Sequence, residues 1–512
     1  MNEVFGYTWL AFALTAAWSG IGICLAGYGF NSLWLAVRAL CHVRRVADGT
    51  GMPDGPWPAV TVQIPLYNEQ HVARRVIDCC ARLEYPNDLL QIQVLDDSED
   101  RTRHLAEGRV QYWRERGVDI DLLPRSERDG YKAGALRAAL GTATGDFMCL
   151  FDADFQPHPR FLKAVLAPML QPGRERCGFV QARWTSANRQ RSRLTDAVTV
   201  ALEGHFAVET RARCLQSHWF AFNGSGGIWR RQCLEDPAVG GWSTASLCED
   251  LDLSYRAQLA GWQGRYLDSV AVAADAPERW ADFRSQQFRW AKGSVQTLLR
   301  LAGPVLRSGR RPPWHRIQAM FHMAGYLVNP LLLAGLLLTG PLLALDVDFP
   351  RWLPWLIPGA FGPLALLVAG QWRLRRPLGW DLAATCSVLL LAGVGLCWSN
   401  SVAVWEAARH RHSEFLRTPK SDCRFAVAET YARDPWPLEN RMLVPEILLL
   451  LYAGLVLGTA IHARAPAIGW VALLGLLGFG SVAWHTWRDR WYRGRWSRIR
   501  PGGSEHARPG HI

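Results

Sequence analysis

Two aspartates separated by one residue, Asp152 and Asp154, follow the apolar run FMCLF. Side chains two positions apart on an extended chain share a face, so the two carboxylates could hold one cation between them. Hard oxygen ligands suit Mg²⁺ or Mn²⁺, and such an ion could carry the diphosphate of a nucleotide. A solvated turn explains a lone Asp-x-Asp equally well, so the surrounding elements must decide.

A second acidic pair, Asp96 and Asp97, ends the apolar run LLQIQVL in the same manner. These carboxylates could hold a nucleoside ring or ribose, although a strand-ending turn is the simpler interpretation. Downstream, the stretch RDGYKAGAL places Lys132 at the head of an Ala-rich helix, where an ammonium group could bind phosphate. Lys132 is one of only four lysines among 57 basic residues, which favours a specific need for ammonium there.

The third acidic pair, Glu249 and Asp250, starts a segment whose apolar residues recur at helical spacing. Acidic residues are common near helix starts, so capping is one explanation. Catalysis is the other, because an aspartate within reach of a substrate hydroxyl can act as a general base.

All three pairs lie in a region that runs from Ala59 to about Asp275. Four apolar runs predict buried strands there: AVTVQIP, LLQIQVLDDS, DFMCLFDAD and CGFVQARW. Helical stretches between them indicate an α/β fold with a mostly parallel sheet. In such sheets ligands bind beyond the carboxyl ends of the strands, where the first two acidic pairs lie.

Long apolar segments flank this region. Tyr7 to Ala36 carries no charge and exceeds the ~20 residues that cross a bilayer. Glu3 precedes this segment and arginines follow it, so the positive-inside rule places the N-terminus outside and the next domain in the cytoplasm. Further apolar segments follow at about 318–345, 353–370, 382–405, 444–463 and 466–486.

Three of these segments separate the α/β region from the basic stretch EAARHRHSEFLRTPK. If all three crossed the membrane, that stretch would lie outside, against its charge. We therefore expect either 353–370, which contains three prolines, or 382–405, which has basic flanks, not to cross cleanly.

Composition also favours a membrane protein. The formal net charge is +12, and arginines gather beside the apolar segments, which indicates a lipid surface and no nucleic-acid partner. Twelve scattered cysteines without a CxxC pattern favour free thiols in a reducing compartment.

The stretch RSQQFRWAKG, Arg284 to Gly293, lies where the α/β region meets the apolar segments. Alone it is typical of an interfacial Trp-Arg anchor. Together with DDS, DAD and ED in this order, its Gln286-x-x-Arg289-Trp290 spacing resembles the processive membrane-embedded family-2 glycosyltransferases, the cellulose, chitin and hyaluronan synthase group; Gln287 would be a filler position. RDGYKAGAL, FNGSGGIWR, EDLDLSYRAQLAGW and EFLRTPK are closest to cellulose-synthase-like mannan and glucomannan synthases and their bacterial relatives. The resemblance covers roughly residues 55–425.

This resemblance implies a GT-A fold, joined here to an α-helical transmembrane bundle, and an inverting transfer. Asp97, with Asp96 beside it, would contact the nucleotide, and Lys132 would contact its diphosphate. Asp152 and Asp154 would hold a divalent metal, Mg²⁺ or Mn²⁺, and the donor phosphates.

On the acceptor side, the resemblance implies that Asp250 deprotonates the hydroxyl that attacks the anomeric carbon. Gln286 and Arg289 would lie near the donor diphosphate. The implied acceptor-binding residues are Trp290, Glu249, Phe222, Asn223, Gly224 and Ser225. The stretch FLRTPK would close over the nucleotide, with Lys420 at the donor.

Two features depart from the pattern. Cys248 stands where the family usually has Thr before Glu-Asp, which we expect to alter packing without removing the base. The N-terminal part has one apolar helix where cellulose synthase has several, so a homodimer could be needed to complete a translocation channel.

We predict a processive hexosyltransferase that polymerises a β-linked mannan, glucomannan or glucan from GDP-mannose or UDP-glucose and moves the chain across the membrane. A single-transfer glycolipid synthase of the ceramide glucosyltransferase type is the alternative, but FLRTPK and the number of C-terminal spans favour the polymerase. A non-catalytic transporter or receptor is disfavoured because every expected acidic residue is present. We expect the protein in the bacterial inner membrane with its catalytic domain cytoplasmic.

The expected domain plan follows the chain. It comprises an N-terminal helix with its basic flank (1–47), a linker (48–58), the glycosyltransferase domain (59–293), an interfacial amphipathic helix (294–316), a transmembrane region (317–487) with a cytoplasmic loop at 414–422, and a basic tail (488–512).

Overall fold

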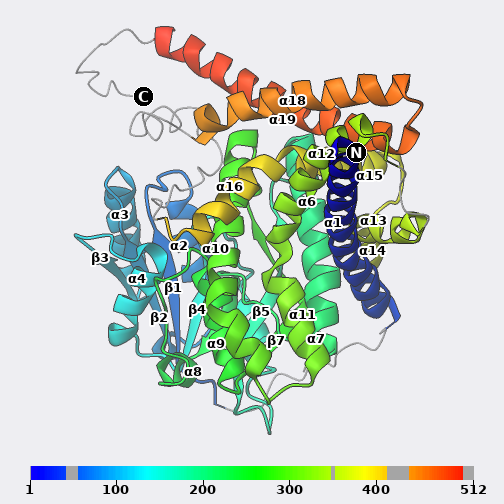
Figure 1. The fold of residues 1–512 in the computed structure, drawn as a ribbon. Coiled ribbons are helices and arrows are strands. Elements are labelled where there is room, and N and C mark those ends of the chain that lie inside the picture. Colours follow the sequence, from blue (N-terminus) through cyan, green and yellow to red (C-terminus); the bar gives the residue numbers. More distant parts are fainter. Residues whose placement is uncertain (1, 42–55, 348–351, 412–437, 500–512) are drawn as a thin grey trace.

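The structure, a computed structural model, describes residues 2–41, 56–347, 352–411 and 438–499 (Figure 1). Most of the predicted linker, the loop 414–422 with Lys420 and the end of the basic tail lie outside the described residues. The expectations for them stay predictions.

The α/β region contains one seven-stranded sheet with the order β3-β2-β1-β4-β6-β5-β7. β1 pairs in parallel with β2 and β4, and β2 with β3; β6 is antiparallel to both of its neighbours, and β5 is parallel to β7. The strands are β1 Val60–Leu66, β2 Leu90–Asp96, β3 Ile120–Pro124, β4 Phe147–Leu150, β5 Cys177–Ser186, β6 Gly227–Arg230 and β7 Gln263–Ala274. The prediction of a mostly parallel α/β sheet is confirmed, with one antiparallel strand inserted.

Helices cover both faces of the sheet, which explains why β1 and β2 are buried along nearly their whole length. One face packs against α2 Ala73–Ala81, α3 Thr102–Arg114 and α5 Phe161–Leu166. The other packs against α4 Tyr131–Ala139, α8 Arg231–Glu235 and α9 Glu249–Leu259. This two-sided core holds the carboxyl ends of β1, β2 and β4 at one edge.

Two long helical rods leave the sheet. The first comprises α6 Arg193–Gly204, a π-helix at His205–Thr210 and α7 Arg211–Leu215. The second is α10 Trp280–Arg307, which is followed by α11 Pro313–Met323. The predicted boundary between 293 and 294 therefore falls inside one continuous helix. In the segment expected to lie at the membrane surface, Leu298, Leu301 and Val305 are buried in a cluster with residues of α9 and α11.

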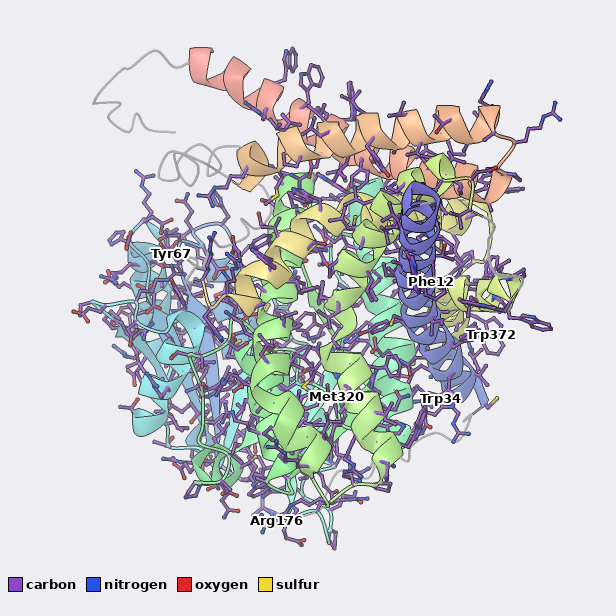
Figure 2. The ribbon with its side chains drawn as sticks, viewed as in Figure 1. Phe12, Trp34, Tyr67, Arg176, Met320 and Trp372 are labelled. Carbon is purple, nitrogen blue, oxygen red and sulfur yellow. The ribbon has the colours of Figure 1, made fainter. Side chains whose placement is uncertain are left out.

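In the part of the chain that the structure describes, five helical segments are long and apolar enough to cross a membrane by length and composition. They are Trp9–Cys41, Gly325–Ala344, Pro354–Arg373, Arg441–His462 and Pro466–Trp491. The corresponding helices are α1 Asn2–Cys41, α12 Val328–Ala344, α13 Ile357–Ala360 with α14 Gly362–Arg373, α18 Leu438–His462 and α19 Pro466–Ile499. Large apolar side chains on these helices are exposed on the surface, among them Phe12 and Trp372, which are labelled in Figure 2.

The apolar segment 382–405 is broken. It forms α15 Trp380–Gly395 and α16 Cys397–Ala408, which are bent by 47° relative to each other, and the pair would be a sixth span only if counted as one. At the break, Gly395 packs on α19, where a Cβ atom would lie 2.4 Å from the carbonyl oxygen of Gly478. Of the two segments expected not to cross cleanly, this is the one with the sharper break. α18 and α19 lie side by side and run crosswise to α1 (Figure 1).

Candidate active site

Four charged residues gather where β4 ends. The Lys132 Nζ atom lies 2.6 Å from Asp152 Oδ1 and 3.8 Å from Glu249 Oε1, and it donates a 2.8 Å hydrogen bond to the carbonyl of Gly224. Asp250 stands beside them, within electrostatic reach of Lys132. We call Lys132, Asp152, Glu249 and Asp250 the lysine-centred cluster. Three carboxylates share one ammonium group, so the cluster carries a net negative charge.

The absence of a side chain at Gly224 allows Lys132 and Asp250 to approach its backbone closely. Its φ of +82° lies in the left-handed region, and a Cβ there would sit 2.9 Å from Asp250 Oδ2 and 3.4 Å from Lys132 Nζ. The next residue, Ser225, accepts a 2.9 Å hydrogen bond from the amide of Asp152. The loop FNGSGG thereby ties the end of β4 to the start of α9.

Burial dominates the electrostatics of the cluster. Burial first, and then the charge of Glu249, raise the pKa of Asp250 to about 7. Burial also raises the pKa of Glu249, although Lys132 opposes this. Burial lowers the pKa of Lys132, but Asp152 and Glu249 outweigh it and the net pKa is raised. Lys132 is therefore charged, and Asp250 can accept a proton near neutral pH.

The predicted Q-x-x-R-W box lies on α10, and Gly293 brings this helix close to the start of α9. A Cβ at Gly293 would lie 2.4 Å from the Cys248 Sγ atom, so the Cys248 position is a packing contact. Gln286, Arg289 and Trp290 all line the cavity described below. Gln287 was predicted to be a filler, but it also faces the cavity and accepts a 3.0 Å hydrogen bond from the hydroxyl of Tyr326.

Arg289 lies within electrostatic reach of the lysine-centred cluster. Burial lowers its pKa, while the nearby Cys248, Glu249 and Asp152 raise it. A second fixed cation therefore lies beside the carboxylates, where a diphosphate would be attracted.

At the end of β2, the two aspartates have different positions. Asp97 lines the cavity and forms a two-pronged ion pair with Arg125, at 2.7 and 2.5 Å. Asp96 is fully buried and accepts hydrogen bonds from Arg103 at 2.9 Å and from the amide of Ser98 at 3.1 Å. These bonds stabilise the loop that follows β2.

The residues of the loop FNGSGG also differ in position. Asn223 and Gly224 reach the cavity. Phe222 is fully buried against Phe179 and Trp229, and Ser225 is buried with its hydroxyl at Asp152. Asp96, Phe222 and Ser225 were expected to contact substrate, but they support the cavity wall because neighbouring strands enclose them.

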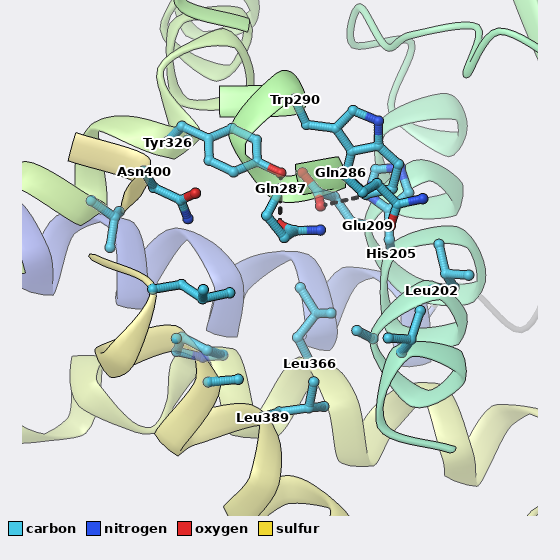
Figure 3. A pocket seen from close by; sticks show the side chains of 18 of the residues that line it. Leu202, His205, Glu209, Gln286, Gln287, Trp290, Tyr326, Leu366, Leu389 and Asn400 are labelled. Carbon is cyan, nitrogen blue, oxygen red and sulfur yellow. Dashed lines mark hydrogen bonds and ion pairs between the residues drawn. The ribbon is translucent and has the colours of Figure 1, made fainter. Parts of the chain in front are cut away.

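One continuous cavity of about 2010 Å³ connects the carboxyl edge of the sheet to the apolar helices. Its polar end contains the residues above, and its far end is lined by side chains such as Leu366 and Leu389 (Figure 3). Sequence reasoning missed His205 and Glu209, which line it from the π-helix. Their spacing of four residues was the available signal, since it aligns them on one helix face.

The fit to a divalent cation rests on the chemistry of the donors. Among the described residues, no three or more His, Cys, Asp or Glu side chains converge to enclose a metal ion. Asp152, whose side chain is 35% exposed, and Asp154 both line the cavity and offer hard oxygen ligands. Mg²⁺ and similar ions are commonly held by one or two carboxylates together with substrate phosphates, so this pair fits such an ion.

In sheets of this kind, ligands bind at the carboxyl edge, where these acidic groups lie. Residues 58–293 match the family model described as Glycosyltransferase like family 2. Residues 58–293 are therefore similar to family-2 glycosyltransferases, in agreement with the motifs.

Two plant proteins are similar over longer stretches. Glucomannan 4-beta-mannosyltransferase 7 of Arabidopsis thaliana is 33% identical over 68% of this chain and 64% of its own length. Probable glucomannan 4-beta-mannosyltransferase 7 of Oryza sativa subsp. japonica is 38% identical over 49% of this chain and 43% of its own length. The chain thus spans less than two thirds of the length of these curated relatives.

Among solved structures, a mannosyltransferase, PcManGT from Pyrobaculum calidifontis in complex with GDP-Man and Mn²⁺, is similar with a TM-score of 0.48 and 21% identity. The match covers 78% of this chain and all of that one.

Proposed function

We propose that this chain is a membrane-bound, inverting mannosyltransferase that extends a β-linked mannan or glucomannan from GDP-mannose. One observation carries the proposal: the lysine-centred cluster opens into a single large cavity that continues between the apolar helices, in a chain related to glucomannan 4-beta-mannosyltransferases. The relatives favour GDP-mannose over the UDP-glucose that the motifs also allow.

In the proposed reaction, Asp250 accepts the proton of the acceptor hydroxyl as its oxygen bonds to the anomeric carbon and the bond to the diphosphate breaks. Lys132 and Arg289 lie where they can stabilise the negative charge that develops on the departing nucleoside diphosphate. Asp152 and Asp154 would hold Mg²⁺ or Mn²⁺, which when bound supplies positive charge to the same phosphates. Trp290 offers a flat apolar face on which an acceptor sugar can stack.

The remaining parts of the proposal concern the membrane. We propose that the enzyme resides in a bacterial inner membrane with the glycosyltransferase domain on the cytoplasmic side, that it acts processively, and that it translocates its product. The cavity that runs from the carboxyl edge of the sheet to the apolar helices supports a path for the product. A homodimer that completes the channel stays a prediction.

A glycolipid synthase is a second candidate because the far end of the cavity is lined by Leu202, Leu366 and Leu389, which suit an acyl chain better than a sugar (Figure 3). The test is to reconstitute the protein in nanodiscs and to offer GDP-mannose, UDP-glucose, UDP-GlcNAc and UDP-galactose separately, with Mg²⁺ or Mn²⁺. We expect GDP release and a long β-mannan from GDP-mannose. A lipid with a single sugar would support the glycolipid synthase, and release from none of the donors would overturn both.

A further inference from the structure

The π-helix His205–Thr210 interrupts the rod formed by α6 and α7 beside the cavity. Such segments are rare and occur frequently at functional sites. It presents His205 and Glu209 to the cavity, with 29% and 23% of their side chains exposed, and the His205 Nδ1 and Glu209 Oε2 atoms are 3.1 Å apart. Neither residue has a role in the proposed donor chemistry.

Hydrogen bonds fix this pair from both ends. On one side, Asn223 Nδ2 lies 3.3 Å from His205 Nε2, which links the pair to the loop beside Asp250. On the other side, Arg213 lies 3.1 Å from Glu209 Oε1 and donates a 2.9 Å hydrogen bond to the carbonyl of Gln318. The side chains are therefore held in one orientation while part of each still faces the cavity.

The charge state suits recognition of hydroxyl groups. Burial raises the pKa of Glu209. The hydrogen bond from His205 and the charge of Arg213 together lower this pKa by more than burial raises it, so the carboxylate is ionised. An ionised, partly exposed carboxylate is a strong acceptor for sugar hydroxyls.

The residues of α10 add complementary chemistry to the same cavity. Trp290, Gln286 and Gln287 line it, and Gln287 accepts a hydrogen bond from Tyr326 (Figure 3). An indole face and amide groups in one cavity with a carboxylate suit a hexose, since it has apolar faces and a polar edge. The leucines further along the cavity offer no hydrogen bonds.

From this geometry we propose that Glu209, held in place by His205, forms an acceptor subsite, in which its carboxylate accepts hydrogen bonds from the hydroxyls of a hexose unit of the growing chain while Trp290 covers the face of that unit. The inference rests on the proposed function. It adds specificity-determining residues that the motifs of the domain do not contain.

The test measures acceptor and donor separately in nanodiscs. For Glu209→Gln we expect the KM for β-1,4-mannotetraose and its Kd by calorimetry to rise about 10- to 100-fold, because a hydrogen bond to a charged group is lost. The KM for GDP-mannose and the slow hydrolysis of GDP-mannose without acceptor should stay unchanged. The matched control is Glu107→Gln, because Glu107 pairs with His104 on an exposed face of α3 and should change nothing.

An unchanged Kd for mannotetraose, or an equal rise in both KM values, would overturn the subsite. If Glu209→Gln does not fold, as judged by its melting temperature and donor hydrolysis, His205→Gln decides through the same readouts. The calorimetry needs no turnover. Mannotetraose binding that depends on Glu209 in a protein that releases no GDP would therefore overturn the proposed function and leave the subsite standing.

Discussion

The ends of β2 and β4 look alike in sequence, because each is an apolar strand followed by paired aspartates, yet their surroundings differ. After β2, each carboxylate has its own guanidinium partner, Asp96 with Arg103 and Asp97 with Arg125. After β4, Asp152 shares the single ammonium of Lys132 with Glu249 and Asp250.

This difference indicates that the loop after β2 has mainly a structural role and that the residues after β4 have a chemical one. Arg125 donates two parallel hydrogen bonds to Asp97 and Arg103 donates one to Asp96, so the loop after β2 is held in one shape. One ammonium among three carboxylates leaves negative charge that can still bind a cation or accept a proton. We therefore expect the residues after β4 and at the start of α9 to govern the reaction and the buried Asp96 to govern stability.

The largest effect should follow from Asp250→Asn. The amide cannot accept the proton of the acceptor hydroxyl, so we expect the transfer rate to fall by about 10²- to 10⁴-fold. The measurement is GDP release with saturating acceptor. Asp121→Asn is the control, because Asp121 is an exposed carboxylate that pairs with Arg114. Activity that survives in the Asp250 variant would refute the assignment of the base.

The next effect concerns the divalent cation. Chelation should abolish transfer, and Asp152→Asn should raise the concentration of Mn²⁺ or Mg²⁺ needed for half-maximal rate by at least about 10-fold. In Asp97→Asn, the metal titration should stay the same while the KM for donor rises. Equal shifts of the metal titration in both variants would show that the two strand ends are not distinct.

Much of the fold was predictable because its strands have strong local signals. β1, β2, β4 and β5 are short β-branched or aromatic runs, and the first two are buried on both faces. The predicted runs did not include β3 and β6, which have only five and four residues, or β7, whose register shifts against β5. Short length or irregular pairing left these three strands without a clear period in the sequence.

The identity of candidate site residues was predictable where they belong to a recognisable motif. The orientation of their side chains was not predictable. Whether Asp96 or Asp97 faces the cavity depends on Arg103 and Arg125, which lie on different elements. The partners of α10 are still more distant in sequence: Arg284 pairs with Glu446, and the buried Lys292 pairs with Glu406. Such contacts are set by tertiary packing, so single-sequence patterns do not contain them.

The pH dependence should show a moderate effect. Because burial and Glu249 raise the pKa of Asp250 to about 7, the base becomes protonated and kcat/KM falls as pH decreases through that value. Glu249→Gln removes the like charge, so the acidic limb should move to lower pH. The check is a pH profile of GDP release for both proteins. A limb that stays in place or moves to higher pH would separate Glu249 from the titration of Asp250.

The smallest effect should come from Asp96→Asn, and it would be on stability. The Asp96 carboxylate is fully buried, but its partner Arg103 has 40% of its side chain exposed, so solvent weakens the pair. The asparagine side chain can still accept the hydrogen bond from the amide of Ser98, but it has no negative charge to pair with Arg103. The loss of this ion pair should lower the free energy of unfolding by about 1 kcal/mol. We expect a lower melting temperature in detergent and an unchanged KM for GDP-mannose. An increased donor KM at unchanged melting temperature would instead mean that Asp96 contacts the nucleotide, and both strand ends would then be donor sites.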